Sequence, residues 1–207
     1  MKVLVVGAAG KTGRAVVERA VQEGNEVTAF VHSAGGYDVS GVEVRVGDAT
    51  DMAAMEAAIT GQDAVIDTVG GKTPYRHTTL EASVAATIVA AMQRHGVRRL
   101  AVTSMVGEGD SAANTPFYVK IALATFLRGA TPDKANMESA VSGSELDWVI
   151  TRPAVLTEKP ATGDVRIFSA GNRDKAHSIT RSDLAAFLVA QLTSDDNLRQ
   201  AVTIANR

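Results

Sequence analysis

Short apolar runs alternate along the chain with longer segments whose apolar residues recur at helical spacing. The runs are rich in β-branched residues and end at glycine or polar turns, which is typical of strands buried on both faces of a sheet. They predict strands at residues 3–6, 26–31, 42–46, 64–67, 99–103, 147–151, 165–169 and 199–204. The helical patterns occupy residues 12–23, 51–60, 77–95, 116–128, 133–142 and 181–192.

Regular alternation of strand and helix predicts an α/β fold with a doubly wound, mainly parallel sheet and helices on both faces. The 207 residues suit one such domain. Since no linker, repeat or low-complexity stretch interrupts the pattern, we expect a single domain over residues 1–207.

A glycine-rich stretch at residues 7–13, the glycine loop, follows the first predicted strand and opens the first predicted helix. It reads GAAGKTG. Its first glycine suits a tight turn, its second lets the backbone approach a diphosphate, and its third lets the helix pack on the sheet. The helix N-terminus favours the anion. The loop therefore predicts an NAD(P)-binding Rossmann domain rather than a mere turn. The expected contacts are Gly7, Ala9, Gly10, Lys11, Thr12 and Gly13.

The end of the second predicted strand bears on which dinucleotide is bound. An NAD-selective site normally has Asp or Glu there to hold the ribose 2′-hydroxyl, whereas this chain has Val31, His32 and Ser33. The missing carboxylate favours NADP, with NAD still possible. We expect His32 and Ser33 to contact the cofactor, and Arg14 is a further candidate for positive charge beside a 2′-phosphate.

Two more turns at strand ends are candidates for cofactor contact. Asp48 and Ala49 follow the third predicted strand, where a polar turn meets the adenine edge, although Asp48 is equally suited to a turn or a helix cap. Val69, Gly70 and Gly71 follow the fourth predicted strand, where glycine lets the backbone pass close to a ribose.

Composition narrows the possible functions. The chain has no cysteine, and its four histidines are scattered, so we expect no metal site. A formal net charge of −2 does not indicate the basic surface that nucleic-acid binding requires. No apolar stretch approaches the roughly 20 residues of a membrane span. We therefore expect a soluble, cytoplasmic protein that binds small molecules, with a monomer favoured and a dimer as the alternative.

Further motifs continue through the whole chain: GDATD at 47–51, GQDAVID at 61–67, IVAAMQRHGV at 88–97, VTS at 102–104, DKANME at 133–138, ELDWVITRPAVL at 145–156 and ITRSDLAAFL at 179–188. Together with the glycine loop, they make the chain resemble the atypical short-chain dehydrogenases, namely the NAD(P)H-binding NmrA-like group. Within it the chain looks most like the biliverdin-IXβ reductase/flavin reductase branch.

The resemblance implies a nicotinamide laid across the carboxyl edge of the sheet. Ser104 falls where the group places a serine facing the nicotinamide, and Lys134 where a residue approaches the ribose or the substrate. These two are the expected catalytic residues. Thr103, Pro153 and Ala154 are expected to contact the cofactor, and residues of about 151–180 to form a small substrate-side region.

Plainer structural roles compete with these. Ser104 is also suited to a buried strand end with its hydroxyl bonded to backbone, and Lys134 to a helix surface with Glu138 at i, i+4. We expect Arg181 and Asp183 to form a helix cap and a local pair.

One departure from the short-chain dehydrogenases concerns the proton relay. The conventional short-chain dehydrogenases use a Tyr-x-x-x-Lys motif, but Ala122 stands four residues after Tyr118, and Lys120 faces elsewhere on a helix. Acceptors that need little protein acid are therefore favoured. We expect an NADPH-dependent oxidoreductase passing hydride to a flavin, quinone or related conjugated acceptor, with Tyr75 and His77 beside it. The alternative is a non-catalytic NAD(P)-binding redox sensor, and a nucleotide-sugar epimerase is a weaker one.

Overall fold

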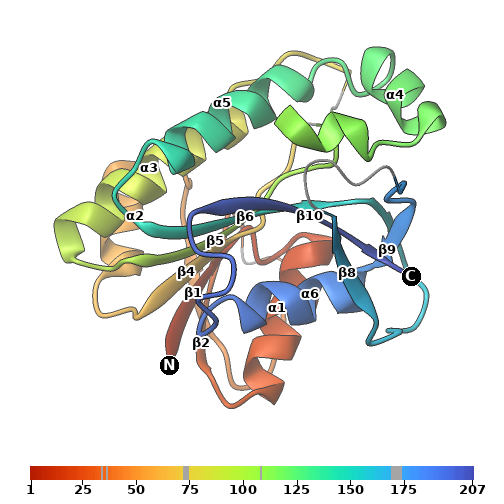
Figure 1. The fold of residues 1–207 in the computed structure, drawn as a ribbon. Coiled ribbons are helices and arrows are strands. Elements are labelled where there is room, and N and C mark those ends of the chain that lie inside the picture. The colour runs from red at the N-terminus through yellow and green to blue at the C-terminus, as the bar shows by residue number, and fades with distance from the viewer. Residues whose placement is uncertain (34, 36, 72–74, 108, 169–173) are drawn as a thin grey trace.

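The computed structural model describes residues 1–33, 35, 37–71, 75–107, 109–168 and 174–207, which form an eight-stranded sheet and a second, two-stranded sheet (Figure 1). The large sheet contains β1 (Lys2–Val6), β2 (Glu26–Val31), β3 (Glu43–Val46), β4 (Ala64–Asp67), β5 (Arg99–Thr103), β6 (Asp147–Pro153), β8 (Val165–Phe168) and β10 (Gln200–Asn206). The small sheet contains β7 (Val155–Thr157) and β9 (Ser178–Thr180). The helices are α1 (Lys11–Gln22), α2 (Met52–Ile59), α3 (Leu80–His95), α4 (Phe117–Ala124), α5 (Thr131–Ser142) and α6 (Arg181–Ala190), with a 3₁₀ helix, η1 (Gly109–Ala113).

The strand order of the large sheet is β3-β2-β1-β4-β5-β6-β10-β8, with only β8 antiparallel to its neighbour in the described part of the chain. Connections from β1 run outward through β2 to β3, and the chain then returns through α2 to β4 on the other side of β1. This reversal places a switch point between the carboxyl ends of β1 and β4, where such sheets bind ligands. The predicted doubly wound α/β fold is confirmed.

The central strands β1, β2, β4, β5 and β6 are buried on both faces of the sheet, which explains their continuous apolar residues. Val3 and Val5 of β1 belong to the core under α1 and α6, whereas Leu4 and Val6 belong to the core under α2, α3 and α5. Figure 1 shows these two helix layers on opposite sides of the sheet. None of the described helices is long and apolar enough to span a membrane.

Several predicted boundaries differ from the structure. The helix predicted from residue 77 begins at Leu80, because the Thr78 hydroxyl accepts the Leu80 N–H in a turn. The helix predicted over residues 116–128 ends at Ala124, because Thr125 has non-helical dihedral angles. Strands β7 and β9 were not predicted, since three residues are too short for a period-2 pattern. The last residue of the predicted strand 165–169 lies outside the described residues.

Candidate functional site

The glycine loop lies at the switch point, against the chain that leaves β4. Gly7 has a φ of +78°, and a Cβ atom there would lie 2.9 Å from the backbone nitrogen of Val69. A Cβ atom on Gly13 would lie 2.3 Å from the carbonyl oxygen of Gly7. Because a side chain fits at neither position, the loop is a cradle of bare backbone.

The start of α1 has the character of an anion site. Gly10 is the N-cap, no side chain caps the helix, and the first turn contains no acidic residue. The N–H groups of a first helical turn have no intrahelical partner and carry partial positive charge. Ala9, Gly10 and Lys11 are exposed, and the Thr12 hydroxyl lies on the same turn. These donors fit a diphosphate.

The residues predicted to meet the adenosine half gather near the end of β2. His32 and Ser33 are exposed there, and Arg14 of α1 stacks on the ring of Tyr37, 4.8 Å from its centroid. The cation of Arg14 thus contacts a residue of the segment that follows β2.

Asp48 has the structure of a turn residue. One of its carboxylate oxygens accepts the Thr50 N–H at 2.9 Å and the Thr50 hydroxyl at 2.7 Å. These hydrogen bonds, with a smaller effect of nearby His32, lower the pKa of Asp48. Ala49 beside it is half-buried. The contacts of Asp48 in this structure are therefore those of a turn residue, which was the alternative to a cofactor contact.

The glycine turn after β4 is fixed by two acidic side chains. The Val69 N–H donates to Asp67 at 2.9 Å, and the Gly71 N–H donates to Glu81 of α3 at 2.9 Å. Burial raises the pKa of Asp67 to about 7, against the lowering effect of the Val69 hydrogen bond. Gly70 is exposed, and a Cβ atom there would meet nothing within 4 Å.

Lys134 is a buried residue, and the alternative interpretation of a surface lysine paired with Glu138 is wrong. Its Nζ atom lies 2.5 Å from a carboxylate oxygen of Glu81 and donates to the Thr103 carbonyl oxygen at 3.1 Å. The pairing arises because α5 packs along α3, and Asp133 accepts the backbone N–H groups of the first turn of α3. Lys134 is therefore held at the end of β5 by tertiary contacts.

The Ser104 hydroxyl donates to a side chain rather than to backbone, so the alternative of a backbone-bonded hydroxyl is wrong. Its hydroxyl donates to Glu138 at 2.5 Å, and the same carboxylate accepts Nη2 of Arg152 at 2.6 Å. All three side chains are buried. Because the Ser104 hydroxyl hydrogen points to Glu138, the serine oxygen acts as a hydrogen-bond acceptor toward any bound molecule.

The loop predicted to follow the sixth strand is partly in the sheet. Pro153 ends β6, and its carbonyl oxygen accepts the Val106 N–H at 3.1 Å. The Ala154 N–H donates to the Ile204 carbonyl oxygen at 2.9 Å. The carbonyl group of Pro153 and the N–H group of Ala154 therefore already have backbone hydrogen-bond partners.

Arg181 and Asp183 do not form the expected local pair. Thr180 caps α6, and Arg181 donates to the Thr12 hydroxyl oxygen at 2.6 Å. Asp183 instead accepts the backbone N–H groups of Thr162 and Gly163. Arg181 therefore belongs to the surroundings of the glycine loop, which sequence reasoning missed because 169 positions separate it from Thr12.

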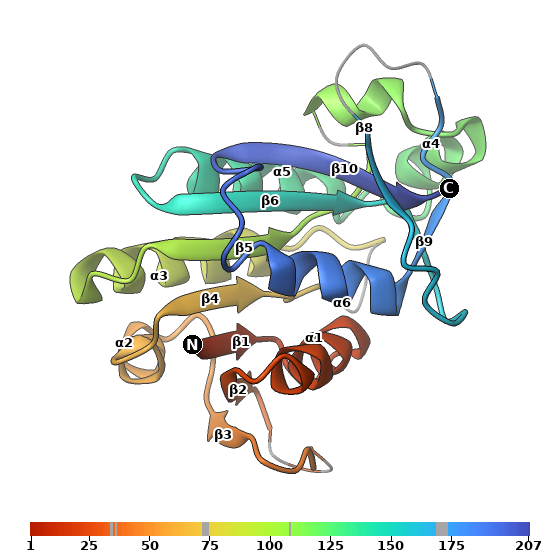
Figure 2. The same cartoon turned by 60° about the horizontal axis from the view of Figure 1, so that its bottom comes forward.

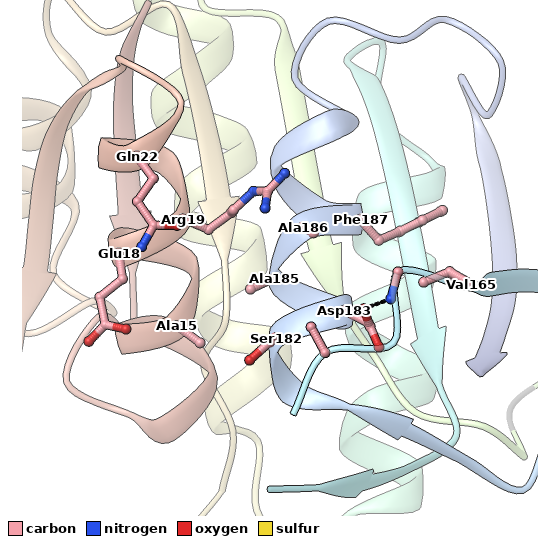
Figure 3. Close-up of a pocket in the computed structure, with 12 residues that line it drawn as sticks. Ala15, Glu18, Arg19, Gln22, Val165, Ser182, Asp183, Ala185, Ala186 and Phe187 are labelled. Atoms are coloured by element: carbon pink, nitrogen blue, oxygen red, sulfur yellow. Dashed lines mark hydrogen bonds between the residues drawn. The ribbon is translucent and has the colours of Figure 1, made fainter. Parts of the chain in front are cut away.

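Two cavities lie apart from the predicted site. One of about 570 Å³ lies between α1 and α6, with Glu18 and Arg19 on one side and Phe187 on the other (Figure 3). The other, of about 470 Å³, lies between α4 and the start of α5. None of the predicted site residues is among the described residues that line them. The predicted cofactor region lies instead at the carboxyl edge of the sheet, around the glycine loop.

Comparison with known proteins places this geometry among dinucleotide-binding proteins. Residues 7–195 match the family model described as NAD(P)H-binding. Over its whole length the chain is 26% identical to the UPF0659 protein YMR090W of Saccharomyces cerevisiae, covering 93% of that protein. ChuY, an anaerobillin reductase from Escherichia coli O157:H7, is 26% identical with a TM-score of 0.81, over all of this chain and 97% of that one.

A further solved structure supports the fold alone. A short-chain dehydrogenase/reductase from Veillonella parvula, solved in complex with NADP, is 18% identical with a TM-score of 0.79. The match covers 99% of this chain and 94% of that one.

Proposed function

The chain belongs to the NAD(P)H-binding family, and from that premise we propose that it is an NADPH-dependent reductase acting on a flavin, quinone or related conjugated acceptor. The observation that carries the proposal is the glycine loop, where Gly7 and Gly13 leave no room for side chains and α1 offers its first-turn amides. A bound nicotinamide supplies the hydride, and the protein supplies orientation and exclusion of water.

The end of β2 supports NADPH over NADH. No carboxylate stands at His32 or Ser33 to repel a 2′-phosphate, and Arg14 lies on the neighbouring turn of α1. The proposed preference is electrostatic, so it should weaken as salt concentration rises.

Ser104 and Lys134 have distinct proposed roles at the nicotinamide end. Ser104 orients a bound group by accepting a hydrogen bond, because its own hydrogen is held by Glu138. Lys134 has three N–H donors, of which one points to Thr103 and one to Glu81. The third is available to a ribose hydroxyl or to an anionic acceptor.

The surroundings of Tyr118 support an acceptor that takes its proton from solvent. Tyr118 is exposed on α4, with its hydroxyl 3.4 Å from Nδ1 of His177, and Lys120 is exposed as well. A tyrosine–lysine pair does not form. Reduction of a conjugated ring tolerates this, since the ring takes hydride at an electrophilic atom without a protein acid.

Aromatic side chains support a planar acceptor. Figure 2 shows α4 beyond the carboxyl ends of β6 and β10. Phe117 of α4 is 78% exposed, and the exposed rings of Tyr75 and Phe126 lie 6.0 Å apart. Exposed aromatic groups beside a site favour a flat apolar molecule. His77, also predicted there, is exposed.

The test is NADPH oxidation, followed by loss of nicotinamide absorbance, with riboflavin, FMN or a quinone as acceptor. We expect turnover with at least one, and faster turnover with NADPH than with NADH. Lys134→Met should lower kcat/KM by roughly tenfold or more, since it removes a charge-assisted donor. Lys2→Met is the matched control, because Lys2 is the first residue of β1 and lies at the amino ends of the strands, opposite the carboxyl ends where the cofactor is expected.

The redox-sensor alternative makes a different prediction. Tight NADPH binding with no turnover on any of these acceptors would favour the sensor. If neither NADPH nor NADH binds, both proposals are wrong.

A further inference from the structure

The guanidinium group of Arg181 is built into the wall of the glycine loop. Arg181 is the first residue of α6, and its side chain is only 16% exposed. Its Nη1 atom donates to the Thr12 hydroxyl oxygen at 2.6 Å. Because this oxygen accepts from Arg181, the Thr12 hydroxyl hydrogen stays free to point elsewhere. A fixed cation and an oriented hydroxyl thus stand beside the first-turn amides of α1.

A carboxylate from another part of the chain lies at the same place. Glu158 follows β7, and its Oε1 atom lies 3.0 Å from Nη2 of Arg181 and 3.6 Å from Nζ of Lys11. The hydrogen bond from Arg181, followed by the charges of Arg181 and Lys11, lowers the pKa of Glu158, so it is an anion at neutral pH. The first turn of α1 has no acidic residue of its own.

The chain between Glu158 and α6 is held in place by hydrogen bonds to Asp183 of α6. Asp183 accepts the N–H groups of Thr162 at 2.9 Å and Gly163 at 3.0 Å, and the Thr180 hydroxyl at 2.7 Å. Although partial burial opposes them, these hydrogen bonds lower the pKa of Asp183 to about 2. The segment is therefore anchored at Asp183, while the Glu158 side chain remains 61% exposed.

From this arrangement we propose that Arg181 is a diphosphate-binding residue of the cofactor site, and that Glu158 is an intramolecular competitor for the same cations. When a diphosphate enters the glycine loop, Arg181 and Lys11 exchange the Glu158 carboxylate for phosphate oxygens. An arginine holds a phosphate with its planar, multi-donor fork, whereas the exposed carboxylate is held weakly. The proposal rests on the dinucleotide site of the proposed function.

Opposite effects of two substitutions provide the test. Dissociation constants of NADPH and NADH are measured by calorimetry or nicotinamide fluorescence, with no acceptor present. We expect Arg181→Met to weaken binding of both by about tenfold or more, and Arg181→Lys by less. Glu158→Gln should tighten binding by about two- to fivefold, since it removes the competing anion.

The comparison of NADPH with NADH locates the contact. Both carry a diphosphate and only NADPH carries a 2′-phosphate, so Arg181→Met should weaken the two by the same factor. The matched control is the Arg19–Glu23 pair of α1, whose Nε and Oε1 atoms lie 2.5 Å apart. Arg19→Met and Glu23→Gln should leave both dissociation constants unchanged.

Several results would overturn the proposal. If Arg181 and Glu158 only brace the fold, both substitutions should lower the melting temperature and shift affinity in the same direction or not at all. If Arg181→Met weakens binding of NADPH but not of NADH, Arg181 contacts the 2′-phosphate, and the diphosphate contact is refuted. Equal affinity of Arg181→Met and the natural chain refutes this inference while the proposed function stands, whereas failure of the natural chain to bind either dinucleotide refutes the proposed function itself.

Discussion

Replacing Asp67 with asparagine should stabilise the protein at neutral and alkaline pH. Asp67 ends β4, is 4% exposed, and has its pKa raised to about 7 because burial disfavours the charged form. The Val69 N–H and Lys134 favour the charge but do not outweigh burial. Asparagine has nearly the same shape, keeps an oxygen for the Val69 N–H, and never ionises.

The magnitude follows from the shift in pKa between the unfolded and folded chain, from 3.8 to about 7. A carboxyl group whose pKa is raised by folding contributes stability that is fully present below 3.8 and is lost as pH rises through about 7. At about 1.36 kcal/mol per pKa unit, the complete loss is about 4 kcal/mol. About 2 to 3 kcal/mol of it falls between pH 5 and pH 8.

The assay is urea unfolding at several pH values from 5 to 8, followed by circular dichroism. The quantity to compare is the free energy of unfolding of Asp67→Asn minus that of the natural chain, in which titrations common to both cancel. It should grow by about 2 to 3 kcal/mol over this range. Asp63→Asn, an exposed position just before β4, is the control and should show no such growth. Parallel curves for Asp67→Asn and the natural chain would refute the reasoning.

Three further substitutions test other contacts of the site. Gly13→Ala places a Cβ atom 2.3 Å from a loop carbonyl oxygen and should weaken NADPH binding by more than about tenfold, measured by calorimetry, while costing about 1 to 3 kcal/mol in urea unfolding. Glu81→Gln removes the anion beside Lys134 and should raise the KM for NADPH more than it lowers kcat, as steady-state kinetics would show. Glu138→Gln removes the buried anion beside Arg152, which keeps Asp110 as a second partner, and should cost about 1 to 3 kcal/mol in urea unfolding, so an unchanged midpoint would contradict the buried ion pair.

Much of the fold was predictable because its signals are local. The apolar runs of β1, β2, β4, β5 and β6 appear directly in the sequence, since strands buried on both faces need continuous apolar residues. Caps are equally local: Asp51 and Thr180 accept first-turn N–H groups of α2 and α6, a role for which Asp and Thr are favoured residue types. Trp148 of β6 is buried in the core, where it packs.

The glycine loop was predictable for the same reason. Its three glycines, the strand before them and the helix after them lie within about a dozen residues, so the turn and the anion site need no distant partner. Its place at the switch point came only from the strand order of the folded sheet. The ends of α3 and α4 were misplaced, because a side-chain turn at Thr78 and the dihedral angles of Thr125 override the helical pattern.

What the sequence alone determined is therefore the α/β fold, the glycine loop and the family to which they point. Only the tertiary structure decided which charges meet: Lys134 pairs with Glu81 rather than with Glu138, and Arg181 reaches Thr12 rather than Asp183. Periodicity and caps arise from neighbours along the chain, whereas an ion pair depends on how helices and loops pack across tens of residues. That packing turns a set of recognisable motifs into a particular site.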